Sequence, residues 1–198
     1  QELMKPSNVN QKKHDTATFY SISNCQDGLS RVTLGNFLIK RVVYEIQEEL
    51  PYIKNFGTLS PIPGFVEWFS YLEEIKIKNI LGNLTNQNVS FLKSKDLKIG
   101  DHRFIENKDA IIKLVVHYIV NEKNQKGLPV NAVSRFHLGN GAIVEDIVVN
   151  ANISEVGFKR SFGVMVNYLY ELRNIEKNHE DYMNNNQVIV SNKIRKYL

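Results

Sequence analysis

The chain has 198 residues, of which 42% are hydrophobic and 23% are charged, and its formal net charge is +4. This length suits one domain that can bury a core, and the mild positive charge suits a polyanionic ligand. The sequence contains no run of 18 apolar residues and no basic stripe interleaved with aromatic residues, so we expect neither a membrane span nor a nucleic-acid partner.

The N-terminal half predicts two strands that alternate with two helices. Residues 1–15 are polar and indicate the tail of a helix and a linker. Aromatic and β-branched residues predict a strand over Thr18–Cys25. A short strand over Asn55–Leu59 and a helix over Gly64–Ile77 follow later. Between the strands, spacing of i+4 predicts a long helix that stops at Pro51. Its apolar stripe is made of Leu34, Leu38, Val42, Ile46 and Leu50 and is widened by Phe37, Ile39 and Val43.

The C-terminal half predicts one helix and two strands after an irregular segment. Residues 79–107 are rich in Asn, Lys and Ser and indicate a partly helical insertion. Apolar residues along one side predict a helix over Lys108–Asn121, and strands are predicted over Ala142–Ile153 and Gly163–Tyr170. The Asn-rich run after Tyr182 predicts a frayed end. Strands alternating with helices make an α/β domain.

Ser60 stands in the segment Leu59–Phe65, between an apolar run and a turn built from Pro61, Pro63 and Gly64. Each proline fixes its own φ and biases the preceding residue toward an extended backbone. A rigid, exposed serine directly after a strand can aim its hydroxyl into a pocket. The alternative is a structural turn in which Ser60 only caps the following helix.

His137 lies between two apolar residues and directly before the turn signal Gly139-Asn140-Gly141. Histidine is the side chain whose ordinary pKa allows proton transfer near neutrality. By itself this segment fits equally a buried structural histidine. A third segment, Asn24–Asn36, is a polar loop between a predicted strand and a long helix, and such a loop presents free N–H groups to phosphate.

In their order and spacing, these segments resemble the malonyl-CoA decarboxylase family from about residue 16 to about residue 182. The matching stretches are Phe19–Ser23, Leu34–Val43, Leu59–Phe65, Phe136–Leu138 with Asn140–Ala142, and Met165–Tyr170. The resemblance implies an acetyltransferase-like (GNAT-type) mixed sheet with flanking helices, which splays to admit a pantetheine arm. It implies a linker or helix tail at 1–15, a catalytic domain at 16–182 with a helical insertion at about 73–130, and a tail at 183–198. It also implies that the first strands of the family's sheet are missing.

The resemblance implies a carboxy-lyase of fatty acid metabolism that converts malonyl-CoA to acetyl-CoA and carbon dioxide. Ser60 then stabilises the enolate, and His137 protonates it or acts as a charged donor to its oxygen. No cofactor is required beyond the coenzyme A of substrate and product. The pyrophosphate of that coenzyme A is expected against Ser30, Arg31, Val32, Thr33, Leu34, Gly35 and Asn36, with Arg31 and Lys40 as ion partners.

Further expectations concern partners and location. The family forms homo-oligomers, so we expect one here. The single cysteine, Cys25, fits a reducing compartment, which is the cytoplasm, or the mitochondrial matrix if the source is eukaryotic. His179 precedes two acidic residues, but three adjacent residues cannot face one ion without a tight turn. We therefore expect no metal site, and we predict a solvated loop around His179.

The sequence departs from the family pattern after His137. Val148 and Asn152 stand where members commonly carry Asn and Asp, a tryptophan usual near Val149 is absent, and Phe162 replaces a small residue. These changes bear on the support of His137. Two alternatives therefore stand beside the decarboxylase: an acyl-CoA-binding acetyltransferase-like protein, and a non-catalytic fragment that acts in assembly.

Overall fold

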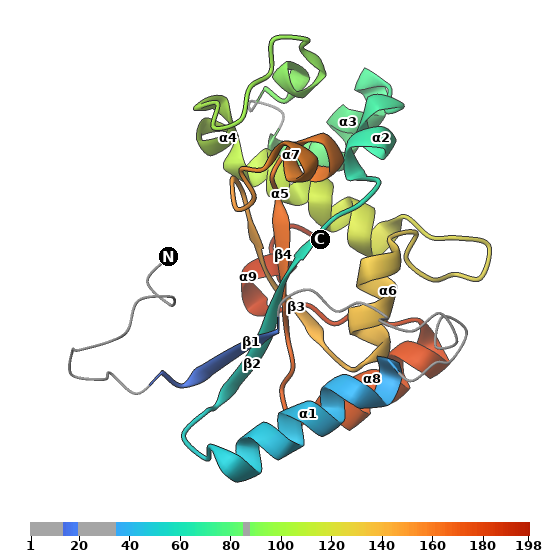
Figure 1. Ribbon diagram of the computed structural model, residues 1–198. Coiled ribbons are helices and arrows are strands. Elements are labelled where there is room, and N and C mark those ends of the chain that lie inside the picture. The colour runs from blue at the N-terminus through green and yellow to red at the C-terminus, as the bar shows by residue number, and fades with distance from the viewer. Residues whose placement is uncertain (1–13, 20–34, 85–87) are drawn as a thin grey trace, which may run out of the picture.

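A four-stranded mixed sheet forms the centre of the fold (Figure 1). The structure is a computed structural model that describes residues 14–19, 35–84 and 88–198. The strands are ordered β1-β2-β4-β3; β1 is parallel to β2, whereas β4 is antiparallel to both β2 and β3. Their bounds are Thr16–Phe19 for β1, Asn55–Pro61 for β2, Ile143–Val148 for β3 and Met165–Leu169 for β4.

Helices pack around this sheet, so the predicted α/β class is confirmed. In Figure 1, α1 and α8 lie at one end of the strands and α2, α3, α4 and α7 at the other, while α5 and α6 lie beside the sheet. The bounds are Gly35–Glu49 for α1, Phe65–Ser70 for α2, Glu74–Leu81 for α3, Arg103–Glu106 for α4, Lys108–Val116 for α5, Ala132–Gly139 for α6, Glu155–Ser161 for α7, Ile175–Asn185 for α8 and Asn192–Arg195 for α9. Short 3₁₀ turns cover Gly82–Leu84 and Ser90–Lys93, and a π-helical turn covers His117–Asn121.

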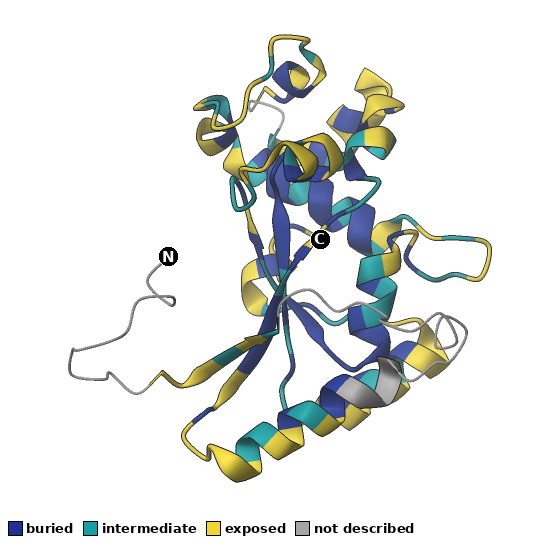
Figure 2. Ribbon diagram, viewed as in Figure 1, coloured by how far each residue is buried: buried dark blue, intermediate teal, exposed yellow. Residues whose placement is uncertain are grey.

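The buried core follows β2, β4 and α5, which are dark blue in Figure 2. All but one of the nine residues of α5 bury their side chains or lie between buried and exposed, and Ile111, Leu114 and Val115 are fully covered. At the α2 end of the molecule an aromatic cluster joins helices far apart in the sequence. Phe65 and Phe104 both meet the ring of Phe162.

The strand predicted over Thr18–Cys25 overlaps β1 at Thr18 and Phe19, and β1 begins two residues earlier. The rest of the predicted strand lies outside the described residues. The strand predicted at Asn55–Leu59 extends two residues further, since Ser60 and Pro61 pair with Val166 and Met165. The strand predicted over Ala142–Ile153 is too long. It ends at Val148, and Asn150 then takes a left-handed conformation with φ 57°.

The long helix is confirmed as α1, and the buried part of its predicted apolar stripe is the side that Ile39 and Val43 widen. Ile39 and Val43 are the buried residues, whereas Val42 and Ile46 are half-buried and Leu50 is exposed. The i+4 repeat drifts around a helix that has 3.6 residues per turn, so five such positions cannot all face one core.

The single helix predicted over Gly64–Ile77 is wrong, because the structure divides this segment into α2 and α3. The chain leaves the helical path at Tyr71, and Leu72 turns into the core. Lys93 donates a hydrogen bond to the carbonyl oxygen of Leu72, in the break between α2 and α3. The predicted partly helical insertion is confirmed as the short turns between α3 and α5.

The frayed end predicted after Tyr182 is also wrong. The backbone N–H of Val144 donates to Ile189, and Ser191 donates back to the carbonyl of Val144, so the C-terminal segment pairs with β3. Ser191 caps α9, and Ile194 is buried with 1% exposure. The polar asparagines that suggested fraying occupy the end of α8, which Asn186 closes in a left-handed conformation.

Candidate active site

Ser60 is held inside a strand, not after one. It is the sixth residue of β2 and its side chain is buried, with 6% exposure, so the prediction of an exposed serine is wrong. Pro61 ends the strand, where its missing N–H costs no ladder bond. Gly64 then takes φ 85°, and a Cβ there would lie 2.7 Å from the hydroxyl oxygen of Tyr118. The turn after Ser60 therefore requires glycine at this position.

His137 projects from α6, a helix that the sequence reasoning did not predict. The helix begins at Asn131, whose side-chain oxygen accepts the N–H of Ser134. It ends at Gly139, and Gly141 takes φ 80° where the chain passes against the carbonyl oxygen of Ile175. The Gly-Asn-Gly signal thus marks the end of the helix that carries the histidine.

The two predicted functional side chains meet. Ser60 Oγ lies 2.9 Å from His137 Nε2, although the residues are 77 positions apart. Thr58 Oγ1 lies 3.0 Å from Ser60 Oγ on the same face of β2, since alternate residues of a strand face the same way. The Ser60 hydroxyl can donate to either neighbour and accept from the other.

Two tyrosines contact the imidazole, Tyr168 from β4 and Tyr170 from just after it. The ring of Tyr168 stacks on His137 at 4.4 Å between centroids, and Tyr170 Oη lies 2.8 Å from His137 Nδ1. Both tyrosines are buried, as core packing predicts. Their contacts with His137 were not predicted, although their spacing of two residues already places them on one strand face.

Burial controls the charge of this site. Desolvation lowers the pKa of His137 to about 4, so the imidazole is neutral at pH 7 in the free protein. Burial also raises the pKa of Tyr170, so the phenol keeps its proton. In the described part of the chain, His137 Nδ1 is the only hydrogen-bond partner of that phenol.

These pKa values favour one arrangement of protons. When Tyr170 donates to Nδ1, the neutral imidazole carries its proton on Nε2 and donates to Ser60 Oγ. Ser60 can then donate to Thr58. Among the hydrogen bonds and ion pairs of the described residues, His137 has no carboxylate partner. A neutral hydrogen-bond donor therefore fits the free site better than the charged donor considered from the sequence.

The predicted phosphate loop lies mostly outside the described residues. Ser30–Leu34 are not among the described residues. Gly35 and Asn36 are the first two residues of α1. Lys40, one turn into α1, is buried and its Nζ lies 3.5 Å from a carboxylate oxygen of Glu176.

The departures from the family pattern lie away from the hydrogen bonds of His137. Val148 is at the end of β3, and Asn152 accepts hydrogen bonds from the N–H and hydroxyl of Ser154, which caps α7. Phe162 takes a left-handed conformation with φ 51° and fills the aromatic cluster. None of the three takes part in the hydrogen bonds or ring contacts of His137 with other described residues.

The loop predicted around His179 is wrong, since His179 lies in α8 and its Nδ1 donates to the carbonyl of Gly139 at 2.6 Å. The described residues contain no group of three or more potential metal ligands and no helix long and apolar enough to cross a membrane.

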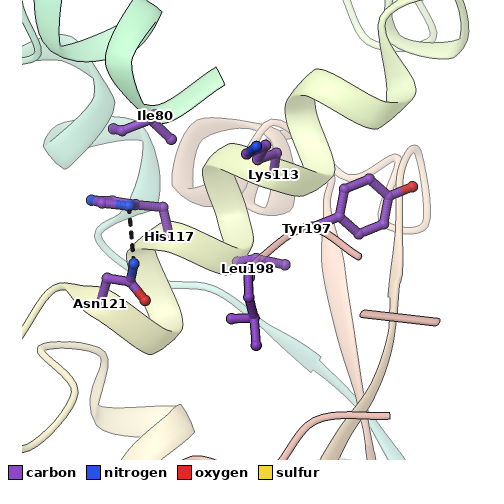
Figure 3. A pocket seen from close by; sticks show the side chains of 7 residues that line it. Ile80, Lys113, His117, Asn121, Tyr197 and Leu198 are labelled. Carbon is purple, nitrogen blue, oxygen red and sulfur yellow. Dashed lines mark hydrogen bonds between the residues drawn. The ribbon is translucent and has the colours of Figure 1, made fainter. Parts of the chain in front are cut away.

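Two cavities lie away from Ser60 and His137. A cavity of about 250 Å³ lies between α2, α3 and the 3₁₀ turn at Ser90–Lys93. A second one, of about 20 Å³, lies beside the π-helical turn, where His117 Nδ1 and Asn121 Nδ2 are 3.4 Å apart (Figure 3). Figure 3 shows Tyr197 and Leu198 reaching this small cavity from the C-terminal end. It has room for about one water molecule.

Comparisons with known proteins identify the family of the chain. The family model described as the malonyl-CoA decarboxylase C-terminal domain matches residues 2–198. The mitochondrial malonyl-CoA decarboxylases of Anser anser anser and Rattus norvegicus are each 33% identical to the chain, over 94% and 96% of it and 40% and 42% of their own length. The chain thus spans about two fifths of these relatives.

Solved structures give the same relationship. The malonyl-CoA decarboxylase of Cupriavidus metallidurans superposes with a TM-score of 0.79 at 36% identity, over 93% of this chain and 48% of that one. The enzyme from Rhodopseudomonas palustris superposes with a TM-score of 0.75 at 37% identity, over 93% and 42%. Because the family model covers residues 2–198, the chain belongs to the malonyl-CoA decarboxylase family and corresponds to its C-terminal domain.

Proposed function

We propose that this chain decarboxylates malonyl-CoA to acetyl-CoA and carbon dioxide. The observation that carries the proposal is the hydrogen bond of 2.9 Å between Ser60 and His137 in a member of this family. In the reaction, the bond between the α-carbon and the carboxyl group breaks. Its electron pair moves into the thioester carbonyl, carbon dioxide leaves, and the resulting enolate takes up one proton at carbon.

Ser60 supplies a fixed donor in this scheme. Its hydroxyl binds the malonyl carboxylate or the enolate oxygen and holds the carboxylate perpendicular to the thioester plane. The strand fixes the backbone of Ser60, so little reorganisation accompanies the reaction. Loss of one such donor in other enzymes lowers the rate by about 10²–10³.

His137 delivers the proton. The free imidazole is neutral, but a malonyl carboxylate placed beside it favours the protonated form and raises its pKa. The imidazolium then transfers its Nε2 proton to the α-carbon once carbon dioxide has left. We infer that substrate binding itself charges His137. A covalent acyl-Ser60 intermediate has no place here, because no acyl group is transferred.

Incubation with malonyl-CoA alone tests the proposal. We expect equal amounts of carbon dioxide and acetyl-CoA without any acceptor. Conversion only after an amine or alcohol acceptor is added would instead identify an acetyltransferase. Binding of coenzyme A without turnover of malonyl-CoA would identify a non-catalytic domain.

We also propose that the segment Ser30–Asn36 binds the coenzyme A pyrophosphate, with Arg31 as an ion partner. The support is its position directly before α1, a helix of 15 residues whose N-terminal N–H groups attract anions. Replacing Arg31 by alanine should weaken coenzyme A binding about tenfold in calorimetry, as expected for one charge-assisted hydrogen bond. Arg41→Ala is the matched control, because Arg41 is exposed and already pairs with Glu45. Equal affinities of both variants and the unmodified protein would contradict the assignment.

We also propose that the sheet is of the acetyltransferase-like (GNAT) type and that the protein forms a homo-oligomer. The parallel pair β1–β2 beside the antiparallel β4 is compatible with such a sheet. Tyr71, Ile75 and Ile153 are 80%, 71% and 73% exposed, and apolar side chains of this kind favour association. Light scattering gives the mass, and a monomer at all concentrations would contradict the oligomer. We place the protein in the cytoplasm or the mitochondrial matrix, in line with the mitochondrial names of its animal relatives.

A further inference from the structure

A buried amide links the segment that carries Ser60 to the helix that carries His137. Asn131 is 2% exposed and stands at the N-terminus of α6, six residues before His137. Its Nδ2 donates to the carbonyl oxygen of Pro63 at 2.8 Å, and Pro63 follows Ser60 by three residues. Its Oδ1 accepts the N–H of Ser134 at 2.9 Å.

The orientation of this amide is determined by its partners. A carbonyl oxygen can only accept and an N–H can only donate, so Nδ2 must face Pro63 and Oδ1 must face Ser134. Aspartate at this position keeps the acceptor for the helix and has no donor for the turn. Serine keeps the acceptor on a side chain one atom shorter, so its hydroxyl does not take the place of Nδ2 at Pro63. The two bonds can therefore be separated by mutation.

The acceptor side of Asn131 also reaches the imidazole. The hydroxyl of Ser134 lies 3.1 Å from Asn131 Oδ1 and 2.8 Å from Tyr168 Oη, and the ring of Tyr168 stacks on His137. On the donor side, Tyr118 Oη gives the Pro63 carbonyl a second hydrogen bond at 3.2 Å. A chain of hydrogen bonds thus connects the turn after Ser60 to Asn131, Ser134 and finally Tyr168, whose ring covers His137.

We propose that Asn131 is a positioning residue: its side-chain amide holds the turn after Ser60 against α6 and so sets the separation of Ser60 Oγ and His137 Nε2. Asn131 caps α6 and His137 is the sixth of its eight residues, so the helix between them transmits this restraint rigidly. An error of about 1 Å in such a pair can lower turnover by about 10². The inference rests on the proposed decarboxylation only in its kinetic readout.

The test compares Asn131→Ser and Asn131→Asp with the unmodified chain. Both replacements are good helix N-caps, so both should keep α6 and unfold cooperatively, with a lower midpoint for Asn131→Asp because its carboxylate is buried. Neither places a donor where Nδ2 meets the carbonyl oxygen of Pro63. Ser154→Ala is the matched control, because it removes the N-cap of α7 outside the site.

The first readout is the ¹⁵N shift of the His137 imidazole, assigned among the five histidines with His137→Gln. Ser60→Ala gives the shift of an imidazole that has lost the serine. We expect both Asn131 variants to move from the unmodified shift toward that of Ser60→Ala, and Ser154→Ala to stay unmoved. Unmoved shifts in Asn131→Ser and Asn131→Asp would overturn the inference.

The second readout is turnover of malonyl-CoA. We expect kcat to fall about 10–100-fold in both Asn131 variants with KM unchanged, and Ser154→Ala to keep its kcat. An equal loss of kcat in Ser154→Ala would overturn the positioning role, since cap loss alone then explains it. If the unmodified chain does not turn over malonyl-CoA, the proposed function fails while the imidazole shifts still decide the role of Asn131.

Discussion

At the scale of single residues, the surroundings of His137 determine how the site titrates. The imidazole is covered by aromatic rings and has hydroxyl partners, so burial lowers its pKa to about 4 from an ordinary value of 6.5. Between these two pH values the unfolded chain binds a proton that the folded chain does not. Stability should therefore be complete above pH 6.5 and fall as the pH is lowered toward 4.

One pH unit of this difference corresponds to about 1.4 kcal/mol, so the whole window contributes about 3 kcal/mol. Urea unfolding between pH 7.5 and 4 measures it, and His137→Gln removes this contribution while leaving the other titrating groups. We expect the unmodified chain to lose about 3 kcal/mol more than the variant. Parallel curves for the two proteins would show that the imidazole is charged in the folded state.

Tyr170 provides a second prediction at this scale. Tyr170→Phe removes the donor to His137 Nδ1 and leaves the ring in place. The imidazole then loses its preferred tautomer, and we expect kcat to fall about tenfold or more in steady-state kinetics. Tyr182→Phe is the matched control, because the buried hydroxyl of Tyr182 has no hydrogen-bond partner in the described part of the structure. A similar loss in both variants would show that buried phenols matter here only for packing.

At the scale of elements, the C-terminal segment contributes to the core. Ile194 of α9 is buried, and the residues before α9 pair with β3. Ile194→Ala should lower the free energy of unfolding by about 2–5 kcal/mol, the usual range for a buried aliphatic side chain. Urea denaturation measures the change. The control is Met183→Ala on α8, where the side chain is 57% exposed. No loss in Ile194→Ala would mean that this end of the chain is frayed after all.

Local patterns predicted the existence of most elements but not their limits. The apolar repeat located α1, and short runs with apolar and aromatic residues located β2 and β4. Neither pattern reports tertiary contacts. Leu72 turns into the core between α2 and α3, and Ser191 pairs with Val144. These long-range contacts ended one helix early and ordered the terminus.

The pair Ser60 and His137 was predicted from motifs, and the structure places the two side chains in contact. Its supporting residues were not predicted. Tyr170 and Asn131 are separated from Ser60 by 110 and 71 positions, so their contacts arise only from the pairing of β2 with β4 and the packing of α6. The helix α6 itself was missed because its eight residues carry too short a repeat to stand out.

At the scale of the whole molecule, the buried imidazole of His137 lies between α6 and one face of the sheet. The sheet supplies Ser60 and Tyr170 from neighbouring strands and their extensions, and α6 supplies His137. The chain spans about two fifths of its curated relatives, yet both proposed catalytic side chains and their described partners lie within it.

Release of carbon dioxide from malonyl-CoA, with no acceptor present, tests the central claim most directly when it is measured for the unmodified chain, Ser60→Ala and His137→Gln. We predict turnover by the unmodified chain and a decrease of about 10²–10³ in kcat for each variant. We also predict that the double variant is scarcely slower than either single one, because the two side chains act as a unit. Turnover that survives both substitutions undiminished would contradict the proposal that this pair performs the reaction.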